Sequence, residues 1–137
     1  MRNIIHNIIC RYIGSGEKDE FYPSKNFIRR ILARAFLYDA KYYFYGSSSV
    51  VMLNDDGVLV LKLFSRTKFR WQEISDSDFG WHRIGDRDED IVYYMKFITN
   101  KNKQVNVNFC SQKICYALGS AVKFIIGKSK NGEAIKL

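Results

Sequence analysis

The sequence is poor in the residues that mark linkers and disorder. It contains a single proline, Pro23, so no stretch looks like a rigid spacer between domains. Of its 137 residues, 47% are apolar and 15% aromatic, which argues against an intrinsically disordered chain. A chain of this length buries roughly two thirds of its unfolded surface. We therefore expect one domain with a hydrophobic core of its own.

Cysteine is scarce, and no long apolar run opens the sequence. The three cysteines, Cys10, Cys110 and Cys115, are an odd number that cannot all pair within one chain. The first apolar residues are interrupted by His6 and Asn7, whereas a secretory signal or a membrane span of about 20 residues has a continuous apolar core. The sequence thus predicts a cytoplasmic protein with reduced thiols.

Positive charge exceeds negative charge, but unevenly along the chain. The net charge is +8. Residues 73–90 carry seven acidic and two basic side chains, while residues 91–137 carry eight basic and one acidic. An acidic middle and a basic end favour an anionic partner or a protein with the opposite pattern. The alternative is a solvated surface that serves only solubility.

The first segment has the periodicity of a helix. From Ile4 to Ile13, apolar residues recur at i, i+1, i+4, i+5, i+8 and i+9, which places them on one helical face. We expect this face to pack on the domain or on a second copy of the chain, which would allow a homo-oligomer. The alternative is an interfacial helix on an anionic membrane, but the polar face offers only Arg2 and Arg11 as cations.

A second helix is predicted after Pro23, with Ser24 as its N-cap. Arg29, Arg30 and Arg34 lie on one side of it, where they would contact the phosphates of an anionic membrane or a nucleic acid, or form a solvated face. The other side is an apolar stripe of Phe27, Ile28, Ile31, Leu32, Ala35 and Phe36.

After residue 40 the apolar period changes from about 3.6 to 2, which predicts strands. The clearest unit covers residues 50–74. Within it, Asp56-Gly57 lies between two apolar runs and predicts a hairpin whose glycine accepts a positive φ. Phe69 and Trp71 alternate with polar residues and predict one continuous strand over 68–74. Further strands are expected at 41–45, 79–84, 91–98 and 104–109. The polar segments 76–78 and 85–90 bound the second of these, and a turn is expected at 100–103.

A last helix is expected over residues 111–127. Ser111 is its N-cap, an apolar stripe runs from Ile114 to Ile126, and Gly127 closes it. The polar tail 128–137 is expected to fray.

The order of these elements predicts an α+β fold. Two N-terminal helices occupy residues 1–39. About seven antiparallel strands over residues 40–127 form a bent sheet or a small barrel, which the last helix plugs because so apolar a helix face has to be buried.

Two short motifs in the central region match a known family. Asp55-Asp56-Gly57 lies between two apolar strands, and Trp71-Gln72-Glu73-Ile74 follows in the next one. Bacterial domains of the pleckstrin-homology-like (PH-like) family often carry this pair of motifs, so residues 40–127 resemble a PH-like domain. The resemblance implies a PH-like barrel with a C-terminal capping helix.

In eukaryotic PH-like domains, basic residues around the first hairpin turn hold phosphoinositide headgroups. The matching turn of this chain, residues 46–49, is Gly-Ser-Ser-Ser and has no basic residue, which argues against that ligand. The nearest basic set is Arg66, Lys68 and Arg70, three alternate residues that would line one strand edge. We call these three residues the basic strand.

Few residues suit acid–base or nucleophilic chemistry. His6 in the first helix and His82 beside Trp81 have no partner placed by spacing, so a structural or solvent role is favoured for both. Cys115 falls on the apolar stripe, where thiols act as small core residues. We therefore predict no enzyme. The alternative is a small enzyme that uses Cys110 or His82.

The acidic residues Asp86, Asp88, Glu89 and Asp90 superficially resemble a calcium loop. They lack the central glycine and terminal glutamate of that pattern. The cysteines have no second pair to complete a zinc site. We therefore expect no metal and no cofactor, and interpret the acidic residues as a solvated loop or a protein-contact loop.

The leading hypothesis is a non-enzymatic binding module for another protein. Contact would run through the acidic stretch 76–90 or through an exposed sheet edge such as the basic strand. A short basic chain of this kind also suits a toxin-neutralising immunity protein or a phage-type inhibitor. The second hypothesis is attachment to an anionic membrane or nucleic acid through the basic strand and Arg29, Arg30 and Arg34.

Overall fold

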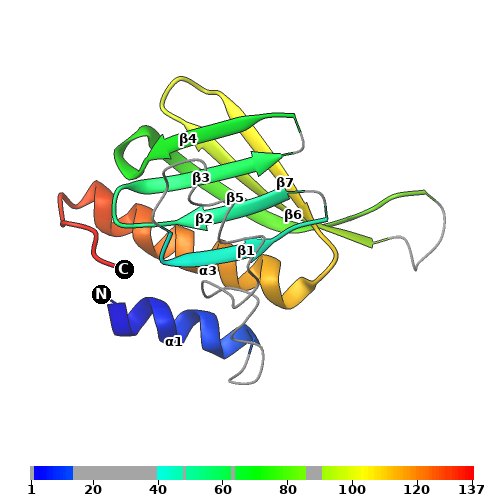
Figure 1. Cartoon of the computed structure of the whole chain (residues 1–137), viewed down its shortest axis with the longest axis horizontal. Coiled ribbons are helices and arrows are strands. Elements are labelled where there is room, and N and C mark those ends of the chain that lie inside the picture. Colours follow the sequence, from blue (N-terminus) through cyan, green and yellow to red (C-terminus); the bar gives the residue numbers. More distant parts are fainter. Residues whose placement is uncertain (1, 14–39, 48, 63, 86–90) are drawn as a thin grey trace.

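Two antiparallel sheets and two helices make up the described part of the chain (Figure 1). The computed structural model describes residues 2–13, 40–47, 49–62, 64–85 and 91–137. The elements in chain order are α1 (Arg2–Ile13), β1 (Tyr42–Tyr45), β2 (Ser49–Leu53), β3 (Gly57–Lys62), β4 (Arg66–Arg70), the 3-10 turn η2 (Trp71–Glu73), β5 (Ile74–Arg83), β6 (Ile91–Thr99), β7 (Gln104–Phe109) and α3 (Gln112–Lys130).

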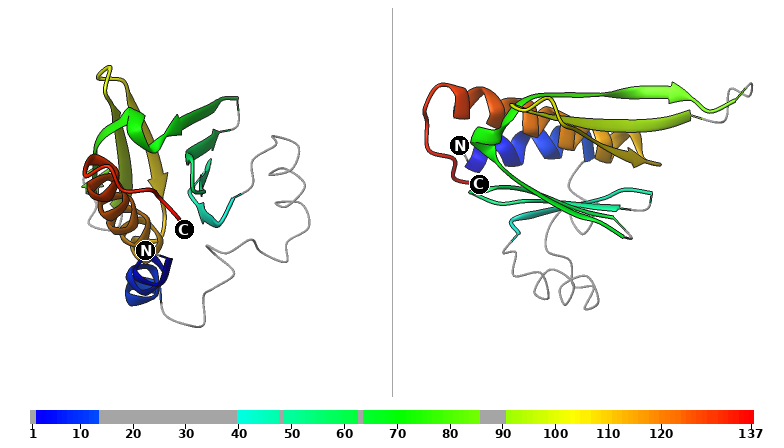
Figure 2. Two further views of the ribbon diagram at one scale, coloured as in Figure 1. Left: turned by 90° about the vertical axis from the view of Figure 1, so that its left-hand side faces the viewer. Right: turned by 90° about the horizontal axis from the view of Figure 1, so that it is seen from above.

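The two sheets face each other across the core. The first sheet has the strand order β1-β2-β3-β4 and the second β5-β6-β7, and every pair is antiparallel. Because side chains alternate along a strand, one face of each sheet points inward. The rings of Phe69 on β4 and Phe97 on β6 join the two layers, with a centroid distance of 6.3 Å. Figure 2 shows the sheets as separate layers, with α3 along one side of the space between them.

The sheets are not closed, so the bent single sheet or PH-like barrel expected from the sequence is wrong. β4 pairs with β3 and β5 pairs with β6, but β4 and β5 belong to different sheets. Between them, residues 71–73 form a 3-10 turn instead of continuing the expected strand. Trp71 opens this turn with a side chain that is only 1% exposed.

Trp71 is also tied to the β2–β3 turn. Its indole Nε1 donates to the carbonyl of Asn54 (2.9 Å), and its backbone N–H donates to the carbonyl of Asp56 (3.2 Å). The side-chain Oδ1 of Asn54 accepts the N–H groups of Asp56 and Gly57, each at 2.9 Å. Gly57 does not have the expected positive φ. Glycine is needed there because a Cβ would overlap the backbone of Phe69 on β4.

β5 runs through residues 76–78, which the sequence predicted as the polar boundary of a strand that begins at Phe79. Asp76 and Asp78 are exposed and Ser77 is buried. Exposed and buried side chains thus alternate as in a strand, but the buried side chain is a serine and not an apolar residue. A register shift between Ile74 and Asp76 marks a bulge at the start of the strand. With β6, β5 forms a long hairpin that extends beyond the rest of the molecule (Figure 2).

α3 carries the apolar stripe that was expected of the last helix. Ser111 caps it as predicted, because its Oγ accepts the N–H of Ile114 (3.3 Å). Most of the stripe from Ile114 to Ile126 is fully buried and joins the main core.

α1 packs on α3, so the first helix lies on the domain itself, which is one of the arrangements expected from the sequence. Ile5, Ile9 and Ile13 are buried in the same core as the sheets. The hydroxyl of Ser120 on α3 donates to the hydroxyl oxygen of Tyr12 (3.0 Å). The second N-terminal helix predicted after Pro23 lies outside the described residues.

The C-terminal tail is held in place and does not fray. α3 continues beyond Gly127 to Lys130. Ile135 and Leu137 are buried against the core. The N–H of Leu137 donates to Oδ1 of Asp55 (2.7 Å). The sequence interpretation missed this because two apolar residues in a polar tail show no period.

Two glycines of α3 should respond to alanine in opposite ways. A Cβ on Gly127 would meet no atom within 4 Å, so Gly127→Ala should raise the free energy of unfolding by about 0.5–1 kcal/mol, since alanine loses less backbone entropy. A Cβ on Gly119 would overlap the ring of Phe79. Gly119→Ala should therefore lower the free energy of unfolding by about 1–3 kcal/mol, because the added methyl group overpacks this contact. Urea unfolding measures both, and effects of the same sign would contradict this packing.

Candidate functional site

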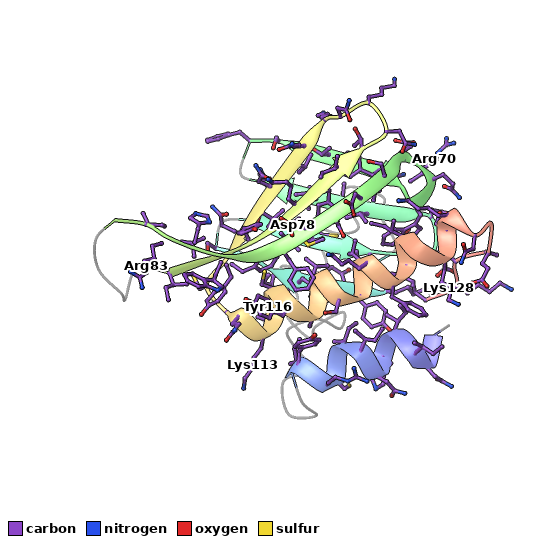
Figure 3. The ribbon with its side chains drawn as sticks, turned by 180° about the vertical axis from the view of Figure 1, so that it is seen from behind. Arg70, Asp78, Arg83, Lys113, Tyr116 and Lys128 are labelled. Atoms are coloured by element: carbon purple, nitrogen blue, oxygen red, sulfur yellow. The ribbon has the colours of Figure 1, made fainter. Side chains whose placement is uncertain are left out.

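The far end of the β5–β6 hairpin is a two-stranded arm. Trp81 pairs with Tyr93, and Arg83 pairs with Ile91. The third strand, β7, ends at Phe109 opposite Tyr93, so no strand of the described residues flanks the hairpin beyond that point. We call residues 81–85 and 91–93 the arm. Figure 3 shows that it extends past the N-terminal end of α3, with Arg83 near its tip.

One face of the arm is open to solvent and carries two apolar side chains, Trp81 and Ile91, together with Arg83, which pairs with Ile91. Trp81 and Ile91 continue the inward face that carries Phe79 and Tyr93, because alternate residues of a strand share a face. The ring of Tyr116 on α3 packs on Phe79 and Tyr93, at centroid distances of 5.3 and 6.1 Å. Only about one helical turn precedes Tyr116 in α3. Trp81 and Ile91 therefore lie beyond the helix, 53% and 37% exposed.

Exposed apolar side chains gather on this arm. With Ile84, which is 56% exposed, it holds three of the six large apolar side chains that are exposed in the described residues. Single exposed apolar residues are normal, whereas a contiguous group marks an interaction surface. The sequence placed Trp81 and Ile84 in one strand with Phe79. It gave no signal for which of them the last helix would leave uncovered.

The opposite face of the hairpin is polar. The ring of His82 lies 5.7 Å from that of Tyr94 (centroid distance). The hydroxyl of Tyr94 donates to Oδ2 of Asp78 (3.3 Å). Partial burial and, second, the neighbouring Asp78 carboxylate raise the pKa of Tyr94. Tyr94 is thus a neutral hydrogen-bond donor at physiological pH, and the arm presents two chemically different faces.

The acidic residues expected to contact a partner, Asp86, Asp88, Glu89 and Asp90, lie outside the described residues. In the sequence they join β5 to β6 and therefore belong to the connection of the arm. Arg29, Arg30 and Arg34, the predicted basic helix face, also lie outside the described residues.

The basic strand is β4, where Arg66, Lys68 and Arg70 are all exposed. They share the outer face of the first sheet, since Phe69 between them points into the core. Arg70 Nε lies 3.8 Å from Oε1 of Glu73. Both side chains of this ion pair are largely exposed, so it contributes little to stability.

A hollow of about 510 Å³ separates β4 from the β6–β7 turn. Lys68 lines it from β4, and Lys101 and Lys103 line it from the turn, with Glu73 as the acidic member. The sequence predicted a turn at 100–103 but not that its lysines approach the basic strand, because this proximity depends on how the sheets face each other. A second hollow of about 580 Å³ mixes Lys68 and Arg70 with acidic residues of the β2–β3 turn.

The candidate catalytic residues lie outside the two hollows beside β4. Cys110 is exposed, with its Sγ 3.2 Å from the hydroxyl of Ser47. His82 lies on the polar face of the hairpin. Neither residue lines either of the hollows beside β4. Within the described ranges, no group of three His, Cys, Asp or Glu side chains is placed to hold a metal ion.

Cys115 is a buried core residue. Its Sγ–H donates to the carbonyl of Tyr94 (3.2 Å), and burial raises the pKa of its thiol to about 12. The thiol is therefore protonated at neutral pH and is not a nucleophile.

Comparisons with known proteins give no relative. No protein-family model matches the sequence, and the searches of curated proteins and solved structures returned no match either. The resemblance to PH-like domains accordingly stays a prediction from two short motifs. No helix in the described part of the chain is long and apolar enough to cross a membrane.

The buried thiol of Cys115 should make the folded protein less stable at alkaline pH. The ordinary thiol pKa is 9.0, so between pH 9 and about 12 the unfolded chain loses this proton while the folded chain keeps it. The free energy of unfolding should therefore fall as the pH rises through this range. The Cys115→Ser variant keeps a donor for the Tyr94 carbonyl, but its hydroxyl does not titrate in this range. As the pH rises, its free energy of unfolding should therefore fall less than that of the wild-type protein. Urea unfolding from neutral pH to about pH 11 tests this, and parallel losses in both proteins would contradict it.

Proposed function

We propose that the chain is a non-enzymatic binding module for another protein and that the arm is its contact surface. The observation that carries this proposal is the exposure of Trp81 and Ile91 on one face of the arm, with Ile84 exposed just beyond the end of β5. Tryptophan is the residue most often found to dominate the binding energy of protein interfaces. The position of the group beyond α3 lets a partner reach it from several sides.

The surroundings of the arm indicate the chemistry of the partner. The connection of the arm contains Asp86, Asp88, Glu89 and Asp90 in its sequence, so a partner with an apolar centre and basic surroundings is complementary. The two edges of the arm, which no described strand occupies, also suit an extended segment of that partner. We place the interaction in the cytoplasm, where thiols such as Cys110 stay reduced.

Replacing the apolar group should abolish partner binding without unfolding the protein. Trp81→Ser combined with Ile91→Ser should weaken the complex by at least about 2 kcal/mol, or roughly 30-fold, because both side chains would be buried in the interface. The matched control is Phe64→Ser, since Phe64 is 96% exposed and lies between β3 and β4 of the first sheet, outside the hairpin that forms the arm. Affinity capture from the native host with wild-type, arm and control proteins, quantified by mass spectrometry, is the measurement.

The partner is the protein that wild-type and control retain and the arm variant loses. Equal capture by all three proteins would overturn the proposal. Fluorescence gives a second readout with the purified partner. Trp71 is buried and Trp81 is exposed, so burial of the arm should shift the emission to shorter wavelength. An unchanged spectrum on saturation would also contradict the arm as the contact surface.

A second candidate function is binding of an anionic polymer at the hollow beside β4. The observation that favours it is the approach of Lys68, Lys101 and Lys103 from two different sheets. A groove lined by cations tracks a phosphate backbone, and such binding weakens steeply with salt.

Charge reversal at this hollow tests the second candidate. Lys101→Glu with Lys103→Glu should weaken binding of a single-stranded oligonucleotide at low salt, and should lower the slope of log affinity against log salt by roughly one unit or more. Lys130→Glu with Lys136→Glu makes the same change in net charge near the C-terminus and should leave the affinity close to wild-type. Anionic vesicles distinguish a lipid surface from a nucleic acid. An equal response of both variants would show that only net charge matters.

A further inference from the structure

The outer face of the second sheet carries polar side chains in three columns around one aromatic ring. Residues that pair directly across antiparallel strands share a face, so the register of the three strands fixes these columns. The central column, on β6, consists of Ile98, Lys96, Tyr94 and Val92. The column on β5 consists of Asp76, Asp78, Gly80 and His82. The column on β7 consists of Gln104, Asn106 and Asn108.

The ring of Tyr94 lies across β5 at a position that has no side chain. Gly80 is the cross-strand partner of Tyr94, and a Cβ on it would come within 3.1 Å of the tyrosine hydroxyl and 3.3 Å of the ring. The hydroxyl donates to Oδ2 of Asp78 (3.3 Å), and the ring of His82 flanks that of Tyr94. An aromatic ring laid over a strand glycine packs one face on the backbone and presents the other outward.

A row of amides lies on the other side of Tyr94. Tyr94 pairs with Asn108 and Lys96 pairs with Asn106, and both asparagines and Gln104 are exposed. Alternate residues of a strand lie about 7 Å apart, so these amides form a straight row. Within the described ranges they make no side-chain hydrogen bond. Each amide therefore offers a donor and an acceptor to a ligand.

The charges of this face argue against a ligand that carries phosphates. Two carboxylates, Asp76 and Asp78, stand against one lysine, Lys96, although the whole chain has a net charge of +8. Nucleic acids are held mainly by cations at their phosphates. A ligand that complements this face is therefore uncharged and supplies hydroxyl or amide donors to the carboxylates.

Sugar rings have these properties. Every sugar hydroxyl is both a donor and an acceptor, which suits a column of carboxylates and a row of amides. The C–H groups on one face of a sugar ring carry a small positive charge and pack on the negative face of an aromatic ring. The same molecule thus matches the ring and the polar columns on both of its sides.

We propose that the outer face of the second sheet, centred on Tyr94, binds a neutral carbohydrate chain. One sugar ring stacks on Tyr94 with hydroxyls toward Asp78, and the chain reaches Asn106 and Asn108. Gly80 is a positioning residue, because it leaves room for the tyrosine ring. Binding is weak, since an open face buries little of its ligand. The site lies opposite Trp81 and is independent of the function proposed above.

A printed array of neutral oligosaccharides, probed with the labelled full chain, tests the proposal and identifies a sugar that is retained. Titration of the 15N-labelled protein with that sugar then locates the site. The amide signals of residues 76–82, 94–98 and 104–108 should shift, and those of the first sheet should not.

Two substitutions at the centre of the face should weaken binding of this sugar. Tyr94→Ala should reduce the affinity roughly threefold to tenfold, because the stacking contact is lost. Gly80→Val should act in the same direction, because its side chain occupies the place of the ring. The matched control is Tyr12→Ala, since Tyr12 is a 37% exposed tyrosine on α1 and its loss should leave the affinity unchanged.

Four results would overturn the proposal. The array retains no neutral sugar, the shifts occur on other surfaces, or the Tyr94→Ala protein binds as tightly as wild-type. The fourth is an oligothymidylate that binds through Tyr94 where no sugar does, which would identify the ligand as a nucleic acid.

Should Tyr94→Ala and Gly80→Val both unfold, the exposed amides decide. Asn106→Ala with Asn108→Ala removes two side chains that pack on nothing in the core and should weaken binding several-fold. The amide signals of Met95 and Phe97, both fully buried, report that the variant is folded. Affinity equal to wild-type in this folded variant would refute the site.

Discussion

The burial of Trp71 is the constraint on which the rest of the architecture depends. Its indole is bonded to the carbonyl of Asn54 while the ring fills the core. At Trp71 the chain leaves β4, makes one 3-10 turn and becomes extended again as β5. Two facing sheets result instead of one closed barrel, and the space at their side has to be filled by another element. The apolar stripe of α3 fills it, and α1 packs against α3 in turn.

The placement of α3 then decides which apolar surface stays in water. Gly119 lets the ring of Phe79 approach the helix closely, and Tyr116 covers the next part of the hairpin. The hairpin is longer than the helix that covers it (Figure 3). Trp81 and Ile91 thus carry the core face of the second sheet beyond the core. Covering this exposed apolar surface with a partner would remove it from water and so favour the complex. This is the physical basis of the proposed partner contact at the arm.

Several local features followed from the sequence because their causes are local. The cap of Ser111, the buried stripe of α3 and the core position of Cys115 depend on helical period and on hydrogen-bonding capacity within a few residues. The strand through Ser77 was missed because a buried serine resembles a turn residue when its surroundings are unknown. The closed barrel was wrong because alternation around Trp71 does not reveal that the chain makes a 3-10 turn there and passes from one sheet to the other.

The sequence alone determined the period of α3, its Ser111 cap and the surplus of positive charge, since each depends on residue type and on spacing along the chain. It expected Arg66, Lys68 and Arg70 to line one strand edge, and these three cations share a face of β4, although the sequence began that strand only at Lys68. Only the tertiary structure brought Lys101 near Lys68 and left Trp81 uncovered. Both outcomes depend on the distance between elements far apart in sequence, which is set by how the two sheets and α3 pack together.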